Sequence, residues 1–273
     1  MPVVNEASIK LAINNIANYG DTDIFPFCID SRMFFDRSDD VKNIIEKIDK
    51  NFDDYLDKIP LLVSKNISAV GYSGFRWGSQ IDPIWNAYLL SLVIQIGKDI
   101  EKARVAEDVV FSYRFSPQKK EGSLFKKDVG WVNFQKKAVA ESKNCEYVLR
   151  CDISDFYPRI YHHRLENALK SATGNQEAVG RIMKILSTIS DGASYGLPVG
   201  GPAARLLSEI LMNRTDRLIR LEGIKYCRFV DDFIIFSESK EESYSSLIKI
   251  NQLLLKNEGL SLQKSKTRIM SRA

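Results

Sequence analysis

Two adjacent aspartates, Asp231 and Asp232, interrupt one of the most apolar stretches of the chain, RFVDDFIIF at 228–236. The residues on either side are aromatic or β-branched, which predicts one strand before the pair and another after it. Carboxylates are almost never buried unless a cation or a metal ion compensates their charge. Two of them inside an apolar hairpin therefore indicate a cation-binding site.

A third aspartate, Asp152, lies near the end of the apolar stretch 147–153 in the same way. A lone acidic residue at a strand end is usually a turn residue or a helix cap, and that interpretation stays open for Asp152 alone. If the strands are neighbours in one sheet, the carboxylates of Asp152 and Asp231 converge at its edge. Their mutual repulsion is then relieved by magnesium. Two such ions roughly 3.5–4 Å apart support in-line phosphoryl transfer.

The elements that must position these side chains follow from periodicity and capping signals. Helices are predicted at 41–56, from Asp82 to about 104, and at 163–172, 202–221 and 242–256. Strands are predicted at 147–153, 225–230 and 233–237, with an extended segment at 262–270. The second half thus reads as strand, two helices, hairpin and helix. This order predicts an α+β fold, in which a small sheet carries helices on one face.

Composition bounds the class of protein. With 273 residues, 44% hydrophobic and 27% charged, the chain is long enough for one large domain or two modest ones. Residues 1–104 carry 12 Lys and Arg against 15 Asp and Glu, whereas 105–273 carry 27 against 20. The basic second half fits a polyanionic partner or a merely solvated surface. The sequence shows no secretory signal or membrane span.

The chain has four cysteines, none in a CxxC pair or at zinc spacing from a histidine: Cys28, Cys145, Cys151 and Cys227. Free thiols and a cytoplasmic location are the expectation.

Five segments, taken in order, resemble the motifs of the reverse transcriptase family, and the resemblance covers about residues 71–270. They are VFSYRF (110–115) of the fingers, CDISDFYPRIY (151–161) of motif A, YGLPVGGPAARLLSEI (195–210) of motif B, FVDD (229–232) of motif C and GLSLQKSKTRI (259–269) of motif D. Within that family the chain looks closest to bacterial abortive-infection and antiphage-defence enzymes. The segments that carry this likeness include GDTDIFPF (20–27), GFRWGSQIDPIWNAYLL (74–90) and FYPRIYHHRLENAL (156–169).

The resemblance implies the fingers and palm of a right-hand polymerase, with the thumb absent or not included. It divides the chain into a helical N-terminal extension (1–70), a fingers-like region (71–145) and a palm with motifs A to D (146–273).

The resemblance also assigns roles. Asp152, Asp231 and Asp232 would hold two Mg²⁺ ions, with Mn²⁺ as an alternative. Lys266 of motif D and Arg114 of the fingers would neutralise phosphate charge, Lys266 also serving as an acid for the pyrophosphate.

Further positions would contact the incoming nucleotide. Asp155 and Phe156 lie where the backbone meets the triphosphate, and Tyr157 occupies the place of the steric gate against a ribose 2′-hydroxyl. Gly200 would let the backbone approach the template strand. Val199 stands where the family usually has a glutamine.

The function implied is RNA-directed DNA polymerase activity in bacterial antiphage defence. The partners implied are an RNA template or an associated non-coding RNA, the DNA product and deoxynucleoside triphosphates, with no membrane. Three alternatives stay open: an RNA-binding palm scaffold without catalysis, an untemplated deoxynucleotidyl transferase, and a nucleotide cyclase, which would leave motif B unexplained.

Overall fold

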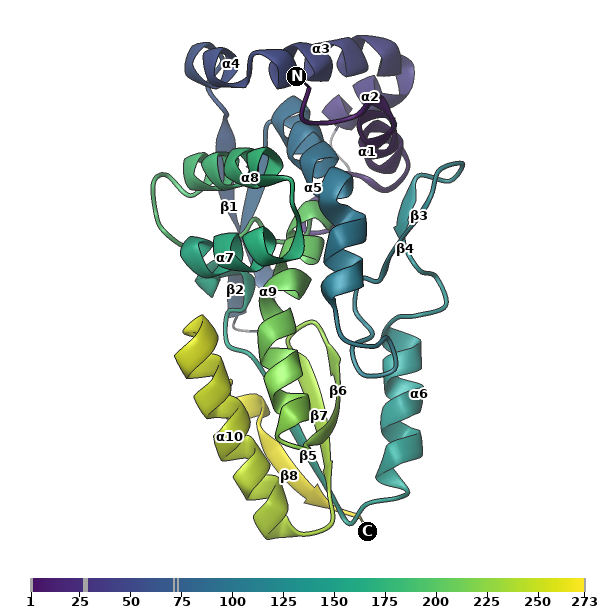
Figure 1. Ribbon diagram of the computed structural model, residues 1–273, viewed down its shortest axis with the longest axis vertical. Helices are drawn as coiled ribbons and strands as arrows, with labels where there is room; N and C mark the ends of the chain where they lie inside the picture. The colour runs from purple at the N-terminus through teal and green to yellow at the C-terminus, as the bar shows by residue number, and fades with distance from the viewer. Residues whose placement is uncertain (1, 27–28, 71, 73, 273) are drawn as a thin grey trace.

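The computed structural model of the protein describes residues 2–26, 29–70, 72 and 74–272. Phe27 of the GDTDIFPF segment and Cys28 lie outside the described residues. In the view of Figure 1, helices from the N-terminal part lie at one end of the molecule, and a small sheet that carries the C-terminus lies at the other.

A long central helix, α5 (Pro83–Ala103), joins the two ends. It begins as predicted, because Asp82 accepts hydrogen bonds from the backbone N–H groups of Ile84 and Trp85 at 3.0 and 3.1 Å and Pro83 occupies the first helical position. Helices α1 (Glu6–Tyr19) and α3 (Ser38–Lys50) pack against it. No helix among the described residues is long and apolar enough to cross a membrane.

The single helix predicted at 41–56 is wrong, because two helices occupy this stretch. Helix α3 ends at Lys50 and α4 (Phe52–Lys58) begins two residues later. Asn51 between them has a φ of −132° and a ψ of 46°, outside the helical region. The apolar period continues through the break, so periodicity alone did not reveal it.

Two β-hairpins precede the palm. Strands β1 (Val63–Val70) and β2 (Gly74–Ile81) form one hairpin, and β3 (Phe115–Gln118) and β4 (Ser123–Phe125) form the other. The predicted N-terminal extension is therefore not helical throughout, and its boundary at residue 70 falls within the first hairpin. A boundary before β1 keeps the hairpin intact.

The palm sheet has four antiparallel strands in the order β6 (Lys225–Phe229), β7 (Asp232–Ser237), β5 (Tyr147–Asp152) and β8 (Arg268–Ser271). Strands β5 and β7 are neighbours, as the predicted convergence of their aspartates requires. In the stretch expected to be extended, a 3₁₀ turn at Lys264–Lys266 precedes β8.

Helices cover the sheet. Alternate residues of β7 point to opposite faces, so Phe233 and Ile235 enter the main core near α9 (Pro202–Leu221) and α10 (Lys240–Glu258). Ile234 and Phe236 instead enter a smaller cluster near α6 (Trp131–Ser142), which covers part of the other face. Helices α7 (His162–Ala172) and α8 (Gln176–Ile189) lie between the sheet and the N-terminal helices (Figure 1). The α+β palm-and-fingers architecture is confirmed.

Candidate active site

The carboxylates of Asp152, Asp231 and Asp232 meet at one end of the palm sheet. Asp152 ends β5 and lies directly opposite Asp232, which begins β7. One ligand oxygen from each of the three residues lies within 4.8 Å of the others. Three hard oxygen donors at this separation fit a divalent cation such as Mg²⁺.

The turn between β6 and β7 presents Asp231. The residue before it, Val230, has a φ of +56°, a left-handed conformation that is rare for a β-branched side chain. The backbone carbonyl of Asp231 accepts a hydrogen bond from the N–H of Ile153 at 3.1 Å, which ties the turn to the end of β5. The geometry of this turn therefore sets where the Asp231 carboxylate lies relative to Asp152.

The electrostatics of the cluster favour cation binding. Burial, reinforced by the charge of Asp152, raises the pKa of Asp231 to about 6, and the same causes raise the pKa of Asp232. Lys266 Nζ lies 3.0 Å from Asp152 Oδ2, and Arg150 lies 3.7 Å from Asp232, but both basic side chains are about half exposed or more. These surface pairs compensate the three negative charges only in part.

A cleft of about 1130 Å³ opens over the carboxylates. Lys266 and the three aspartates lie in its wall together with Asp155, Phe156 and Tyr157. The aromatic side chains that also line it are Phe75, Trp77, Tyr113, Trp131, Tyr161, Tyr195 and Phe229. The cleft thus combines three carboxylates whose oxygens fit a cation with aromatic side chains of the kind on which nucleic-acid bases stack.

The predicted nucleotide-contacting residues follow β5 in a tight turn. Asp155 is exposed, has a φ of +47° and pairs with Arg159 at 3.4 Å. Phe156 is buried in the main core, whereas Tyr157 is only partly buried, with 5.4 Å between the two ring centroids. Burial of the phenol raises the pKa of Tyr157 well above its usual value, so its hydroxyl stays neutral.

Residues 88–273 match the protein-family model described as reverse transcriptase (RNA-dependent DNA polymerase). The chain belongs to the reverse transcriptase family. Among solved structures, the chain is similar to telomerase from Candida albicans, determined in complex with a fragment of telomeric RNA. The TM-score is 0.53 at 12% sequence identity, and the match covers 84% of this chain. It covers 47% of the telomerase chain, so this chain spans about half of that length, and at this identity the likeness shows the fold alone. No curated protein sequence matches the chain.

The structure does not bring Arg114 to the cleft. Its guanidinium is buried, pairs with Glu101 at 3.1 Å and donates to the backbone carbonyl of Val105. In this arrangement Arg114 braces the start of the fingers hairpin against the end of α5. The VFSYRF segment resembles the family's fingers motif, but the direction in which its arginine points could not be read from sequence.

Gly200 has a contact that the sequence did not suggest. It adopts a φ of +98°, and a Cβ built there would lie 2.4 Å from Thr22 Oγ1 and 2.7 Å from Asp23 Oδ1. The missing side chain therefore makes room for the N-terminal segment that carries Thr22 and Asp23, and Gly200 itself does not line the cleft. Its neighbour Val199 does line it.

A buried ion-pair network behind the hairpin was missed by sequence reasoning. Arg228 pairs with Asp216 at 2.6 Å and with Glu209 at 2.9 Å, and Arg104 pairs with Glu209 at 2.7 Å. Ser112 Oγ donates to the same glutamate at 2.6 Å. Arg228 stands in an apolar strand and Glu209 on an apolar face of a helix, and these were the only signals available.

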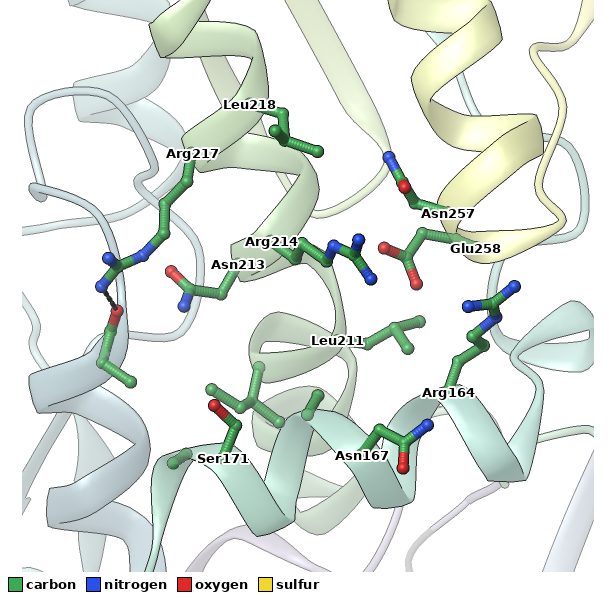
Figure 2. A pocket seen from close by; sticks show the side chains of 14 residues that line it. Arg164, Asn167, Ser171, Leu211, Asn213, Arg214, Arg217, Leu218, Asn257 and Glu258 are labelled. Atoms are coloured by element: carbon green, nitrogen blue, oxygen red, sulfur yellow. Dashed lines mark hydrogen bonds between the residues drawn. The ribbon is translucent and has the colours of Figure 1, made fainter.

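A second cavity, of about 560 Å³, is separate from the three aspartates and lies between α7, α9 and the end of α10. Figure 2 shows Arg164 and Arg214 on either side of the Glu258 carboxylate, which accepts a hydrogen bond from Thr215 at 3.0 Å. Arg217 donates to the backbone carbonyl of Ala103 at 2.7 Å and so caps α5. The charged groups that line this second cavity thus have structural partners or lie near opposite charge, whereas Asp231 in the cleft forms no ion pair with any described basic residue.

Proposed function

We propose that the protein is an RNA-directed DNA polymerase that adds deoxynucleotides by two-metal phosphoryl transfer, with Asp152, Asp231 and Asp232 as the metal ligands. The observation that carries this proposal is the trio of carboxylate oxygens within 4.8 Å, set in a cleft of a chain that belongs to the reverse transcriptase family. Bound divalent cations would activate the attacking hydroxyl and stabilise the leaving pyrophosphate.

Lys266 supplies the mobile positive charge. Its side chain is 63% exposed, so it can leave Asp152 and turn toward a phosphate in the cleft. A cationic donor aimed at charge that develops on the pyrophosphate stabilises the transition state, and its ammonium can deliver a proton there. The pKa of Lys266 is raised by its hydrogen bond to Asp152, so the amine is protonated before substrate arrives.

The proposed partners are an RNA template or an associated non-coding RNA, a DNA product and deoxynucleoside triphosphates. The proposed setting is bacterial antiphage defence of the abortive-infection type. This setting rests on the resemblance of segments such as GDTDIFPF, whose Thr22 and Asp23 pack against Gly200 of motif B. We assign the palm to 146–273 and start the fingers at β1, before residue 70.

Untemplated deoxynucleotidyl transfer is the second candidate. The observation that favours it is Val199, an apolar residue in the cleft where the family usually presents a glutamine to the nucleotide and template. An apolar side chain offers no hydrogen bond with which to check a templating base.

The test is incorporation of labelled deoxynucleotides by purified protein with Mg²⁺, with and without co-purified RNA. We expect Asp231→Ala and Asp152→Ala to lose at least about 10³-fold in rate while staying folded, because they remove metal ligands. Asp54→Ala, which removes an exposed carboxylate paired with Lys58, is the matched control. Full activity in both ligand variants would refute the proposal. Product sequence decides between the candidates, since only templated synthesis copies the supplied RNA.

Sugar selection tests the role proposed for Tyr157. A 2′-hydroxyl that overlaps a packed ring costs about 1–3 kcal/mol, or roughly 5- to 150-fold in rate. Tyr157→Ala should therefore raise ribonucleotide use by about that factor. Phe156→Ala is the control, and should lower stability without relaxing selection because Phe156 belongs to the core. The reverse pattern would show that the motif is aligned one residue out of register.

A further inference from the structure

Val230 holds a conformation that its own side chain disfavours. A φ of +56° at a β-branched residue is strained and persists only where the surroundings impose it. Val230 is buried and immediately precedes Asp231, so any relaxation of its backbone would move that carboxylate. The surroundings of its two peptide groups therefore matter for the acidic cluster.

Both peptide groups that flank the Val230 Cα are held by buried side chains. The N–H of Val230 donates to Ser112 Oγ at 3.0 Å, and its carbonyl accepts from Arg228 Nη1 at 2.6 Å. Ser112 and Arg228 are both fully buried. Fixing the peptide on each side of a Cα fixes φ and ψ together, so these two contacts define the left-handed turn.

The two holding groups are themselves held. Glu209 of α9 accepts from Ser112 Oγ at 2.6 Å and from Arg228 Nη2 at 2.9 Å, which locks the hydroxyl and the guanidinium to one carboxylate. Asp216 lies about two turns after Glu209 in α9. It accepts hydrogen bonds from Arg228 Nε at 2.9 Å and from Nη2 at 2.6 Å. Ser112, Arg228, Glu209 and Asp216, which we call the clamp, thus join three elements: the loop before β3, helix α9 and strand β6.

The geometry points to Ser112, together with Arg228, as a positioning residue for Asp231. We propose that its hydroxyl holds the turn in the conformation in which the three carboxylates share a divalent cation, and so sets the cation affinity of the site. The inference rests on the proposed function only in taking a divalent cation as the ligand of this cluster. Outer hydrogen bonds that orient a metal ligand are typically worth about 10- to 100-fold in affinity.

The experiment compares Ser112→Ala with Tyr226→Phe. The Tyr226 hydroxyl donates to Asp216 Oδ1 at 3.0 Å, so its removal costs the same network one buried hydrogen bond without touching Val230. Mn²⁺ binding, followed by electron paramagnetic resonance without nucleotide, is the readout, and thermal unfolding checks the fold. We expect Ser112→Ala to weaken Mn²⁺ binding about tenfold or more and Tyr226→Phe to change it less than about twofold. Equal effects, or none in Ser112→Ala, would overturn the proposal.

Val230→Gly tests the backbone mechanism. Glycine adopts the left-handed conformation without strain, so the turn depends less on the hydrogen bonds from Ser112 and Arg228. In this background Ser112→Ala should weaken Mn²⁺ binding by less than about threefold, and an undiminished tenfold loss would mean that Ser112 acts by another route. If Ser112→Ala does not fold, Ser112→Cys replaces it, since a thiol is a weak acceptor of similar size.

The proposal and the polymerase assignment fail separately. If Mn²⁺ binding follows the expected pattern but no nucleotide is incorporated, the polymerase assignment is wrong and the positioning role stands. If nucleotides are incorporated and Ser112→Ala binds Mn²⁺ like wild type, only the positioning role is wrong. A wild-type protein that binds no Mn²⁺ would overturn both.

Discussion

Two groups of carboxylates lie on either side of the turn at Val230 and behave in opposite ways: Glu209 and Asp216 pair with Arg228, and Asp152, Asp231 and Asp232 form the acidic cluster. Glu209 and Asp216 are each only 1% exposed, yet both pair directly with Arg228. Asp231 is less buried than either, but it forms no ion pair with any basic residue that the structure describes. Burial alone therefore does not leave a carboxylate without a partner: the more deeply buried pair has a fixed basic partner, whereas the less buried Asp231 has none.

The pKa shifts follow the same division. Burial alone would raise the pKa of Glu209, but the attraction of Arg228 and Arg104 outweighs it and lowers the pKa below its usual value. At the sheet edge burial and Asp152 act together and raise the pKa of Asp231 to about 6. The first group is a completed structural network. The second is compensated only in part, by exposed basic side chains, which is the condition of a site that takes up cations.

The largest effect should come from breaking the completed network. Glu209→Ala leaves the guanidinium of Arg228 and that of Arg104 short of one buried partner, and we expect it to lower the free energy of unfolding by about 3–5 kcal/mol. Urea denaturation measures this. Asp54→Ala, at an exposed pair, should change it by less than about 1 kcal/mol. A loss as small as that of the control would remove the contrast between the two groups.

Removing a charge from the acidic cluster should have the opposite effect and raise the free energy of unfolding. The pKa of Asp231 is about 6 in the folded protein against 3.8 for the free side chain, so its ionisation opposes folding. The penalty is small below the free pKa of 3.8, grows as pH rises from there to about 6, and is complete above the folded pKa. Without metal, Asp231→Asn should therefore be more stable than wild type above pH 7, by up to about 3 kcal/mol, and equally stable near pH 3.5. Thermal unfolding in chelator across this pH range checks it. A variant that is less stable at pH 8 would contradict the sign.

Divalent cations should reverse that penalty. Mg²⁺ at about 100 times its dissociation constant should stabilise the wild type by about 2.7 kcal/mol, since it binds only the folded site. Asp231→Asn, which lacks one ligand, should gain far less. Melting temperatures measured at pH 8 with increasing Mg²⁺ test this, and equal gains in both proteins would place the cation elsewhere.

The smallest effect should come from Lys266. Its pair with Asp152 is largely solvent-exposed on the lysine side, so Lys266→Met should lower stability by less than about 1 kcal/mol. Urea denaturation of the metal-free protein measures it. If Lys266→Met lowered the free energy of unfolding as much as Glu209→Ala, Lys266 would compensate the acidic cluster as fully as Arg228 compensates Glu209 and Asp216. The contrast between the two groups of carboxylates would then fail.

Local patterns in the sequence were sufficient to predict the frame of the palm. Helix α9 has the predicted bounds 202–221, and β5, β6 and β7 differ from the predicted strands by a residue at one end or the other. Apolar alternation, the Gly-Pro helix start and the order of the aspartates are all local signals. The sequence predicted that Asp152 and Asp231 meet if their strands are neighbours, and the pairing of β5 with β7 meets that condition.

Contacts between segments distant in the chain were decided only by the tertiary structure. No periodic pattern in the sequence predicts three of these contacts: the pairing of β1 with β2, the contact of Thr22 with Gly200, and the buried pair of Arg114 with Glu101. The sequence also does not tell whether Arg228 faces solvent or the core. In the packed fold it lies between Glu209 and Asp216. The physical reason is that residue type states which charges need partners, whereas only the packed fold determines which of them receive one.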